Sequence, residues 1–470
     1  MRHAVIFLLL LFAIGSWAAA QSPASLVDRA ATAASSDGFS AQEIRRIQAH
    51  GPWPQPVLRD PSNRVSGNAD AIALGRALFF DVRLSGKGDM SCATCHQPQQ
   101  GFTDGRERAQ GSGSAKKRLD RNTPTLWNAA LARWFGWDGG SDGLWGFSIR
   151  PILDPDELAA TPQHVASLLR ADATLACQYR NAFGWPRAEL RKRRDGDVKS
   201  AGSHDEHVLV EVGKALAAYV ETLNSGKSEF DQLHDALARG DMATAARYPA
   251  AARRGLAIFT GRGQCSVCHF GPNFSNGEFH DIGIPYLAAP GRVDAGRHGG
   301  ITRVKRDQFN LQGGFSDDAS GVAGSRTRHV TQNHTTYGQF KVPSLRNVEL
   351  TAPYMHNGSL ATLRDVVRHY SAIPEERLHQ DGEALLKPLK LTDSEADDLV
   401  AFLTTLTSRE LSAGGAAGRS THRCGQRCSC SVLHPTALAA QPPVSPGKAN
   451  LQRYWSLCDT RLDRLVLRHQ

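Results

Sequence analysis

Long apolar segments, strand-like alternation and net positive charge are all scarce in most of this 470-residue chain. After residue 21 no apolar run approaches the ~20 residues that a membrane-spanning helix needs, so no later span is expected. No stretch alternates polar and apolar residues over the length of a strand, which argues against a β-rich fold. Six of the nine net positive charges lie from Arg409 onward. A nearly neutral body with a basic tail does not fit a nucleic-acid-binding protein.

The first 20 residues have the pattern of a secretory signal peptide. The sequence "MRHAVIFLLLLFAIGSWAAAQ" has a basic start, an apolar run from Ala4 to Gly15, and a cleavage signal at Ala18 and Ala20. The apolar run is too short for a dependable membrane anchor, although an uncleaved N-terminal anchor is the alternative interpretation. We therefore expect export, with residues 1–20 removed.

The cysteines do not follow the pattern of a disulfide framework, although an oxidising compartment would favour disulfides. Four of the nine cysteines lie in two C-x-x-C-H motifs, "CATCH" (Cys92, Cys95, His96) and "CSVCH" (Cys265, Cys268, His269). In a c-type haem site the two thiols add across the haem vinyl groups, and the adjacent histidine becomes the proximal iron ligand. A thioredoxin-like dithiol or half of a zinc ribbon could explain one copy of the motif. Two copies in an exported chain predict two covalently bound haem c groups.

Each motif follows a similar helical segment, which indicates an internal duplication. The segments "AIALGRALFFDVRLSGKGDMSCATCHQ" and "AARRGLAIFTGRGQCSVCHFG" both contain a Gly-x-x-x-Phe core before the motif. We expect a mainly α fold with two cytochrome-c-like helical domains, each with one haem. The predicted N-terminal extension, first haem domain, second haem domain and tail span residues 21–65, 66–240, 241–408 and 409–470.

Other segments differ in how much structure they predict. Helices are expected over 207–224 and 392–407, and the second of these begins with Thr392 and Glu395 in a capping-box pattern. Residues 285–338 are rich in Gly, Ser, Asp, Arg and His with little apolar periodicity, which predicts a long loop or insertion. The tail is rich in small residues and proline, and we expect it to be disordered. Its Cys and His residues fit no zinc or iron–sulfur framework well, so an ordered metal site there is the less favoured interpretation.

Methionine is scarce, which limits how the two irons could be ligated. The chain has four methionines, of which Met1 is in the signal peptide and Met90 is too near Cys92 to reach over the haem ring. Met242 and Met355 remain as thioether candidates. A haem that only transfers electrons needs both axial positions filled, whereas one that activates peroxide needs a position that is open. Two ordinary Met/His electron carriers are therefore a poor fit.

Six segments carry a resemblance to a known family. They are "LFFDVRLSGKGDMSCATCHQPQQGFTDG", "RNTPTLWNAAL", "WFGWDGG", "RPILDPDEL", "CSVCHFGPNFSNGEFHDIGIP" and "VPSLRNVELTAPYMHNGSLATLRDVVRHY". From about residue 50 to residue 408 the chain resembles the bacterial di-haem cytochrome c peroxidase superfamily, above all its MauG-like branch. The resemblance implies a periplasmic oxidoreductase in which the first haem is the peroxidatic one.

The resemblance implies that Tyr370 is the distal ligand of the second haem, opposite His269. In peroxidases of the family a methionine on a helix shortly after the T-A-P-Y stretch ligates this haem, and the MauG-like branch has tyrosine there. A phenolate is a harder, anionic donor than a thioether, so it favours Fe(III) and higher oxidation states. In the alternative interpretation Met355 is the ligand and Tyr370 a packed helix residue. His356 matches a position near the domain junction, and its role is left open.

The resemblance also implies a first haem whose distal face is open. The peroxidases have a distal histidine in the loop before the "RN" motif, whereas residues 104–120 contain none. Glu157 matches the distal acid, which is suited to move a proton between the peroxide oxygens during O–O cleavage. Pro151 matches a neighbouring pocket residue, and Phe147 stands where the peroxidases have glutamine. A surface glutamate is the alternative interpretation of Glu157.

Two further sets of residues match the family pattern. Trp137 matches the tryptophan between the haems, where an indole can relay an electron or a hole; a core tryptophan is the alternative. Asn122, Thr351 and Pro353 match a calcium site between the domains, the last two through backbone carbonyls. Oxygen ligands suit a hard cation, although Asn and Thr in turns are often turn residues only.

These observations predict an exported di-haem c-type enzyme that reduces hydrogen peroxide at its first haem. The second haem would relay electrons from a small cytochrome or cupredoxin, or from a protein substrate that becomes oxidised in a MauG-like modification reaction. A non-catalytic di-haem electron carrier is the alternative from another functional class. We expect one Ca²⁺, no nucleic-acid partner and no membrane span after signal cleavage.

Overall fold

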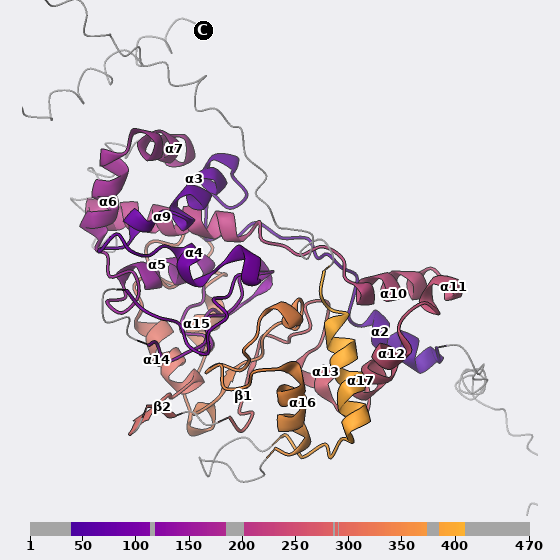
Figure 1. Cartoon of the computed structure of the whole chain (residues 1–470). Helices are drawn as coiled ribbons and strands as arrows, with labels where there is room; N and C mark the ends of the chain where they lie inside the picture. The colour runs from indigo at the N-terminus through magenta and orange to yellow at the C-terminus, as the bar shows by residue number, and fades with distance from the viewer. Residues whose placement is uncertain are drawn as a thin grey trace, which may run out of the picture. The chain divides into compact units, whose positions relative to one another are not determined.

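The computed structural model describes residues 39–112, 118–184, 202–284, 287–289, 291–373 and 385–408 (Figure 1). The expectations for the signal peptide and for the tail concern residues outside these ranges. The prediction of a mainly α fold is confirmed, because the sheets within the described ranges are two antiparallel strand pairs. These pairs are β1 (Phe279–His280) with β4 (Phe340–Lys341), and β2 (Leu287–Ala289) with β3 (Arg292–Val293). No described helix is long and apolar enough to cross a membrane.

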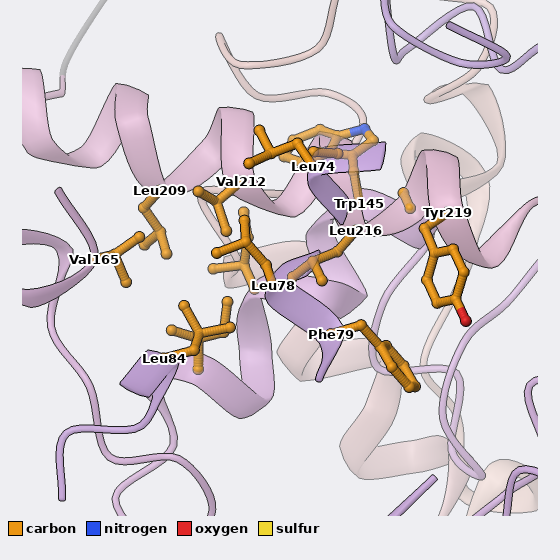
Figure 2. Close-up of a cluster of buried hydrophobic side chains, with 14 of the residues drawn as sticks. Leu74, Leu78, Phe79, Leu84, Trp145, Val165, Leu209, Val212, Leu216 and Tyr219 are labelled. Atoms are coloured by element: carbon orange, nitrogen blue, oxygen red, sulfur yellow. The ribbon is translucent and has the colours of Figure 1, made fainter. Parts of the chain in front are cut away.

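The first half of the chain packs its helices around one apolar cluster (Figure 2). Its elements are α3 (Ala69–Phe79), η1 (Val82–Leu84), α4 (Cys92–Cys95), η2 (Pro98–Gln100), η3 (Ala129–Leu131), α5 (Leu144–Leu153), α6 (Pro162–Ala171), α7 (Ala173–Phe183) and α9 (His204–Val220). Leu74 and Leu78 of α3 lie beside Leu209 and Val212 of α9, and all four side chains are fully buried. This burial is the main stabilising contribution in this half.

A glycine permits the close contact between α3 and α9. A Cβ atom at Gly75 would lie 1.9 Å from the carbonyl oxygen of Ala215, which no side chain can tolerate. The glycine of the Gly-x-x-x-Phe core therefore has a structural role, because it lets two helix backbones touch. Phe79, four residues on, lies one turn further along the same helix and is buried in the cluster.

The second half repeats this arrangement with different residues. Its elements are α10 (Glu229–Ala238), α11 (Met242–Ala245), α12 (Ala250–Thr260), α13 (Cys265–Cys268), η6 (Val348–Leu350), α16 (Leu363–Ser371) and α17 (Asp393–Thr404). A Cβ at Gly255 of α12 would lie 2.0 Å from the carbonyl oxygen of Asp398 in α17. The capping box of Thr392 and Glu395 at the start of α17 is present as predicted. The two halves thus share one helix-crossing geometry, as the duplicated sequence pattern suggested.

The apolar cluster of the second half begins earlier in the chain than residue 241, where the sequence placed its boundary. Ile47 of α2 (Ala41–Gln48) and Phe230 of α10 are buried in the same cluster as Phe259 and Phe402. Part of the predicted N-terminal extension therefore belongs to the second core. The boundary cannot be read from the motif spacing, because the chain returns to this core from two separate segments.

Residues 285–338 are more regular than the predicted long loop. Within the described part of this segment, which leaves out residues 285, 286 and 290, lie several short elements. They are β2, β3, α14 (Arg297–Arg306), α15 (Ser325–His329) and η5 (His334–Thr336). The Thr327 hydroxyl bonds to Asp142, and the Lys214 ammonium donates to Asp317 at 2.6 Å, so this segment packs on the first half. The segment is therefore closer to an insertion with short regular elements than to a continuous loop. Helix α14 lacks an obvious apolar stripe because two of its buried residues are Arg297 and Gly300.

Candidate functional site

Both C-x-x-C-H motifs form a one-turn helix followed by a histidine whose ring orientation is fixed. The Nδ1 atom of His96 lies 3.0 Å from the carbonyl oxygen of Phe102, and Nδ1 of His269 lies 3.0 Å from that of Phe274. When Nδ1–H donates to this carbonyl, the lone pair of Nε2 is left for a metal. Both acceptor residues have a positive φ, 58° at Phe102 and 50° at Phe274, so both turns have the same strained conformation.

Burial keeps both histidines in the neutral form that ligates a metal. Desolvation is the largest cause that lowers the pKa of His96, and it lowers the pKa of His269 to about 4. The backbone carbonyls beside each ring act in the opposite direction and do not overcome it. The imidazoles, the paired thiols and their spacing therefore fit an iron porphyrin at each motif.

A cavity of about 630 Å³ lies next to the first motif. Cys92, Cys95 and His96 line it together with apolar side chains such as Phe79 and Leu216. Polar and charged side chains also line it, among them Thr123, Arg121 and Arg303. The lining also contains carboxylates, among them Asp120 and Asp294. Its apolar side chains suit a porphyrin ring, and its arginines suit the two anionic propionates.

Helix α5 and the turn after it bring the predicted distal residues into this cavity. Phe147, Pro151 and Glu157 are all lining residues. The guanidinium of Arg150 donates to the Glu157 carboxylate at 2.8 Å, and its centre lies 5.6 Å from the centroid of the Phe147 ring. Phe147 also stacks on Phe135 with centroids 5.9 Å apart. Glu157 is thus held at the cavity by Arg150, a residue that the sequence did not single out.

The cavity offers few further iron ligands. Among the described residues that line it, the only histidine is His96 and the only methionine is Met90, next to the first motif. The loop that the sequence singled out for its lack of histidine contributes Gln110, Arg118 and Asp120 to the lining. Among the described lining residues, the cavity therefore offers no second imidazole and one thioether, that of Met90.

The second motif lies beside Tyr370 of α16. Desolvation is the largest cause that raises the pKa of the Tyr370 phenol, followed by the charges of Cys265 and Cys268. The phenol is therefore within electrostatic range of both thiols, and Tyr370 as a whole is half-buried. The neighbouring His369 turns to the backbone, with Nε2 2.7 Å from the carbonyl oxygen of Ile282. Met355 occupies a turn with a φ of 74°, where its carbonyl oxygen accepts from the Gly358 amide at 3.1 Å.

Trp137 connects the first cavity to the second half of the chain. Its indole lines the cavity, and Nε1 donates to the carbonyl oxygen of Asn122 at 2.9 Å. The Trp137 carbonyl oxygen accepts from the backbone amide of Lys341 at 2.7 Å. Lys341 is in β4, which pairs with β1 shortly after the second motif, at Phe279. The indole therefore stands where the two halves meet.

A network of charged side chains around the buried Asp138, which the sequence analysis missed, holds the Trp137 loop. Arg121 lies 2.9 Å from Asp138 and 2.7 Å from Asp294, and Arg303 of α14 also bonds to Asp138. These cations hold the pKa of the Asp138 carboxyl far below its usual range despite its burial. A single Asp after a Trp gives no sequence signal for such a network, because its partners lie far away in the chain.

The residues predicted to bind calcium lie in two loops that touch. The backbone amide of Asn122 donates to the carbonyl oxygen of His356 at 2.8 Å, and the Asn122 side-chain amide donates to that of Arg106 at 2.8 Å. The Thr351 hydroxyl donates to the carbonyl oxygen of Val348 at 3.0 Å. Pro353 follows in the same loop. This proximity is compatible with a cation site, and the calcium assignment stays a prediction.

His356 is buried at the same junction. Its ring stacks on Phe340 of β4 with centroids 3.5 Å apart, and desolvation lowers its pKa to about 3. It is therefore a neutral part of the contact between the two halves. The opposite charges of Asp294 and Arg121 act on it, Asp294 raising and Arg121 lowering its pKa.

Comparisons with known proteins agree with this geometry. The family model described as di-haem cytochrome c peroxidase matches residues 69–238. The methylamine utilization protein MauG of Methylorubrum extorquens is 34% identical over 367 residues, which cover 78% of this chain and 86% of that protein. The chain belongs to the di-haem cytochrome c peroxidase family. The resemblance stated from the sequence motifs is thereby confirmed.

Relatives named MauG and relatives named cytochrome-c peroxidase match this chain about equally well. Cytochrome-c peroxidase IdrP1 of a Pseudomonas species is 32% identical, with 77% of this chain and 87% of that protein covered. A crystal structure of a MauG-like protein associated with microbial copper homeostasis matches with a TM-score of 0.55 and 25% identity, over 77% of this chain and 95% of that one. Membership therefore implies two haem cofactors and an oxidoreductase, and it does not decide between the peroxidase and MauG names.

Proposed function

We propose that this protein is an exported enzyme that reduces hydrogen peroxide, with haem c attached covalently at both C-x-x-C-H motifs. His96 and His269 would hold the two irons on their proximal sides. Haem iron supplies the redox chemistry of O–O bond cleavage when it is bound. The protein residues bind and orient the peroxide, move its proton and connect the two sites.

The observation that carries this proposal is the contrast between the distal sides of the two motifs. The first opens into a cavity of about 630 Å³ that Glu157 lines, whereas the half-buried Tyr370 of α16 is within electrostatic range of the thiols of the second. One site is therefore suited to admit a small oxidant and the other to be closed by a protein ligand. Glu157, oriented by Arg150 at 2.8 Å, is suited to transfer the proton between the two peroxide oxygens.

Trp137 is the proposed connection between the sites. Its indole N–H and its carbonyl oxygen are both hydrogen-bonded, to Asn122 and Lys341 respectively, so its position is fixed by both halves. An ordered aromatic ring between two redox centres can carry an electron or a hole. Trp137→Phe should slow the spectral response of the second haem after the first has reacted. An unchanged response would remove Trp137 from the pathway.

The test of the proposed function is to add peroxide to the ferric protein as isolated and to record both haem spectra. We expect a high-spin ferric signal from the first haem before addition, and a change at both haems at once after it. A requirement for prior reduction would instead assign a conventional peroxidase with an activation step. Two low-spin six-coordinate haems that do not respond to peroxide would assign a non-catalytic electron carrier and contradict the proposal.

A MauG-like reaction is the second candidate function, and the location of Tyr370 favours it. An anionic oxygen donor stabilises oxidised iron more than a thioether does. The second haem would then accept electrons from residues of a partner protein rather than from a small cytochrome or cupredoxin. Mass spectrometry of a candidate partner protein after addition of peroxide distinguishes these donors, because a partner protein that donates electrons becomes oxidatively modified. Export to the periplasm and one bound Ca²⁺ belong to the same proposal, and signal cleavage and metal analysis test them.

A further inference from the structure

The turn after each C-x-x-C-H motif has the same construction in both halves of the chain. The first turn contains "FTDGR" (102–106) and the second "FSNGE" (274–278). In each, the carbonyl oxygen of the first phenylalanine lies 3.0 Å from Nδ1 of the proximal histidine. Two residues later the first turn has Asp104, and the second has Asn276 at the equivalent place. The duplicated scaffold thus differs by one formal charge at this position.

Both side chains perform the same hydrogen-bonding task within the turn. Oδ1 of Asp104 accepts from the backbone amide of Arg106 at 3.2 Å, and Oδ1 of Asn276 accepts from that of Glu278 at 2.9 Å. The turn therefore needs an acceptor oxygen at this position, and an uncharged amide provides it. The negative charge of Asp104 has no role in forming the turn.

Burial of the Asp104 carboxylate in this turn is expected to lower the stability of the folded protein. Its side chain is buried, with 5% of the residue exposed, and Oδ2 has no hydrogen-bond partner among the described residues. Burial of a carboxylate oxygen without a partner disfavours folding. The guanidinium of Arg106, two residues on, donates instead to Oε1 of Gln110 at 3.0 Å. Because Asn would satisfy the turn without this cost, the charge is expected to serve the site.

The electrostatic surroundings of the two proximal histidines differ accordingly. The charge of Asp104 favours a positive His96 ring, and it also acts on the thiol of Cys95. At the second site the charge interaction on His269 comes from His280 and has the opposite direction. An anion near a ligating imidazole makes it a stronger donor, and this outer-shell effect tunes the metal.

We propose that Asp104 tunes the first haem, its buried negative charge stabilising the oxidised states of the iron bound to His96, whereas neutral Asn276 leaves the second haem without this stabilisation. Asp104 acts through His96 and is a positioning and tuning residue rather than a catalytic one. The inference rests on the proposed function, because it requires haem at both motifs. On the proximal side the two sites would then differ by Asp104 and Asn276, in addition to the difference between the cavity and Tyr370 on the distal side.

The test compares Asp104→Asn with the reciprocal variant Asn276→Asp in the full-length protein carrying both haems. Asp104→Asn keeps the acceptor for the Arg106 amide and removes only the charge. In spectroelectrochemical titrations it should raise the midpoint potential of the first haem alone, changing its ratio of reduced to oxidised iron about tenfold at fixed potential, ~59 mV for a one-electron couple. Asn276→Asp should lower the potential of the second haem alone.

Two control variants separate charge from structure. Asp89→Asn removes a carboxylate from an exposed position near the first motif, and it should leave both potentials unchanged because water screens exposed charges. Asp104→Glu keeps the charge with a longer side chain, and its first haem should stay closer to the wild-type potential than in Asp104→Asn. Circular dichroism and haem content check that each variant has folded.

Three outcomes would overturn the inference. They are unchanged potentials in Asp104→Asn, equal shifts at both haems, and equal shifts in Asp104→Asn and Asp104→Glu. The failure of the proposed function gives a different result, namely a wild-type protein that lacks one of the haems or does not react with peroxide. If the protein holds two haems and reduces peroxide, but the haem midpoint potentials are unchanged in Asp104→Asn, only this inference is contradicted.

Discussion

The two halves of this protein are built alike on the proximal side of each motif and differently on the distal side. Each half crosses two helices at a glycine, forms a one-turn helix at C-x-x-C-H, and fixes a histidine through a phenylalanine carbonyl 3.0 Å away. The first half then leaves a cavity lined by Glu157, and the second brings Tyr370 close to its thiols. The comparison teaches that the surroundings of the two proposed proximal histidines are repeated in the fold, whereas the residues proposed for the distal sides are not.

Each half contains an asparagine turn of the same construction, which supports a common origin of the two halves. Asn128 and Asn347 both adopt a left-handed conformation, with φ values of 59° and 61°. Asn128 Oδ1 accepts from the backbone amide of Ser225 at 2.9 Å, and Asn347 Oδ1 accepts from that of Ser408 at 3.0 Å. In each half, this bond ties the segment after the proximal loop to the end of the last helix.

Removing the Tyr370 hydroxyl should have the largest effect on the contrast between the halves. In Tyr370→Phe the second haem would lose its distal oxygen ligand, so its ferric spectrum should change completely while that of the first haem is retained. The shift should favour Fe(II), because a phenolate stabilises the oxidised metal. Electronic absorption and electron paramagnetic resonance of both haems are the measurements. An unchanged second haem would assign the ligand to another residue, and Met355→Leu would then test the alternative.

Neutralising Glu157 should affect only the first half. In Glu157→Gln we expect the rate of reaction with peroxide to fall about 10²–10⁴-fold, because general acid–base catalysis contributes this much. Stopped-flow absorption after peroxide addition is the measurement, with haem content as the check on folding. Arg150→Lys should cause a smaller loss, since it keeps a cation near the carboxylate. Full activity in Glu157→Gln would make this residue a surface glutamate.

Alanine at either crossing glycine should destabilise the protein. The new Cβ would lie within about 2 Å of a backbone oxygen in Gly75→Ala and in Gly255→Ala, and overpacking of this kind costs roughly 1–3 kcal/mol or more. Denaturant unfolding followed by circular dichroism gives the free energy. Gly88→Ala is a control, because nothing lies within 4 Å of its Cβ, although its φ of 70° adds some strain. Tolerance at only one crossing would show that the two halves are packed less alike than the structure indicates.

The smallest expected effect concerns the start of the last helix of each half. Ser203 caps α9 and Thr392 caps α17, each in a capping box. Ser203→Ala and Thr392→Ala should each lower the free energy of unfolding by about 1 kcal/mol. Thermal unfolding measures both losses, and the serine variant of Thr392 should lose almost nothing. A large loss in one half alone would mean that its cap also fixes tertiary contacts.

The sequence could predict those parts of the sites whose chemistry depends on neighbours along the chain. The spacing C-x-x-C-H places two thiols and an imidazole on one turn, so both motifs were recognisable without a fold. The helices predicted over 207–224 and 392–407 largely match α9 (His204–Val220) and α17 (Asp393–Thr404). The packing of α2 on the second core and the short helices and strands within 285–338 could not be predicted, because both depend on which distant segments share a core.

By itself the sequence indicated two haem cofactors, the duplication and the mainly helical class, because the C-x-x-C-H spacing and helical periodicity are properties of short segments. Only the tertiary structure decided how the two sites differ. It brought Arg150 to Glu157, surrounded the Trp137 loop with Arg121, Asp138 and Arg303, and placed Tyr370 beside thiols that are about 100 residues earlier in the chain. The physical reason is that burial and electrostatic interactions depend on distance in space, and residues far apart in sequence set them here.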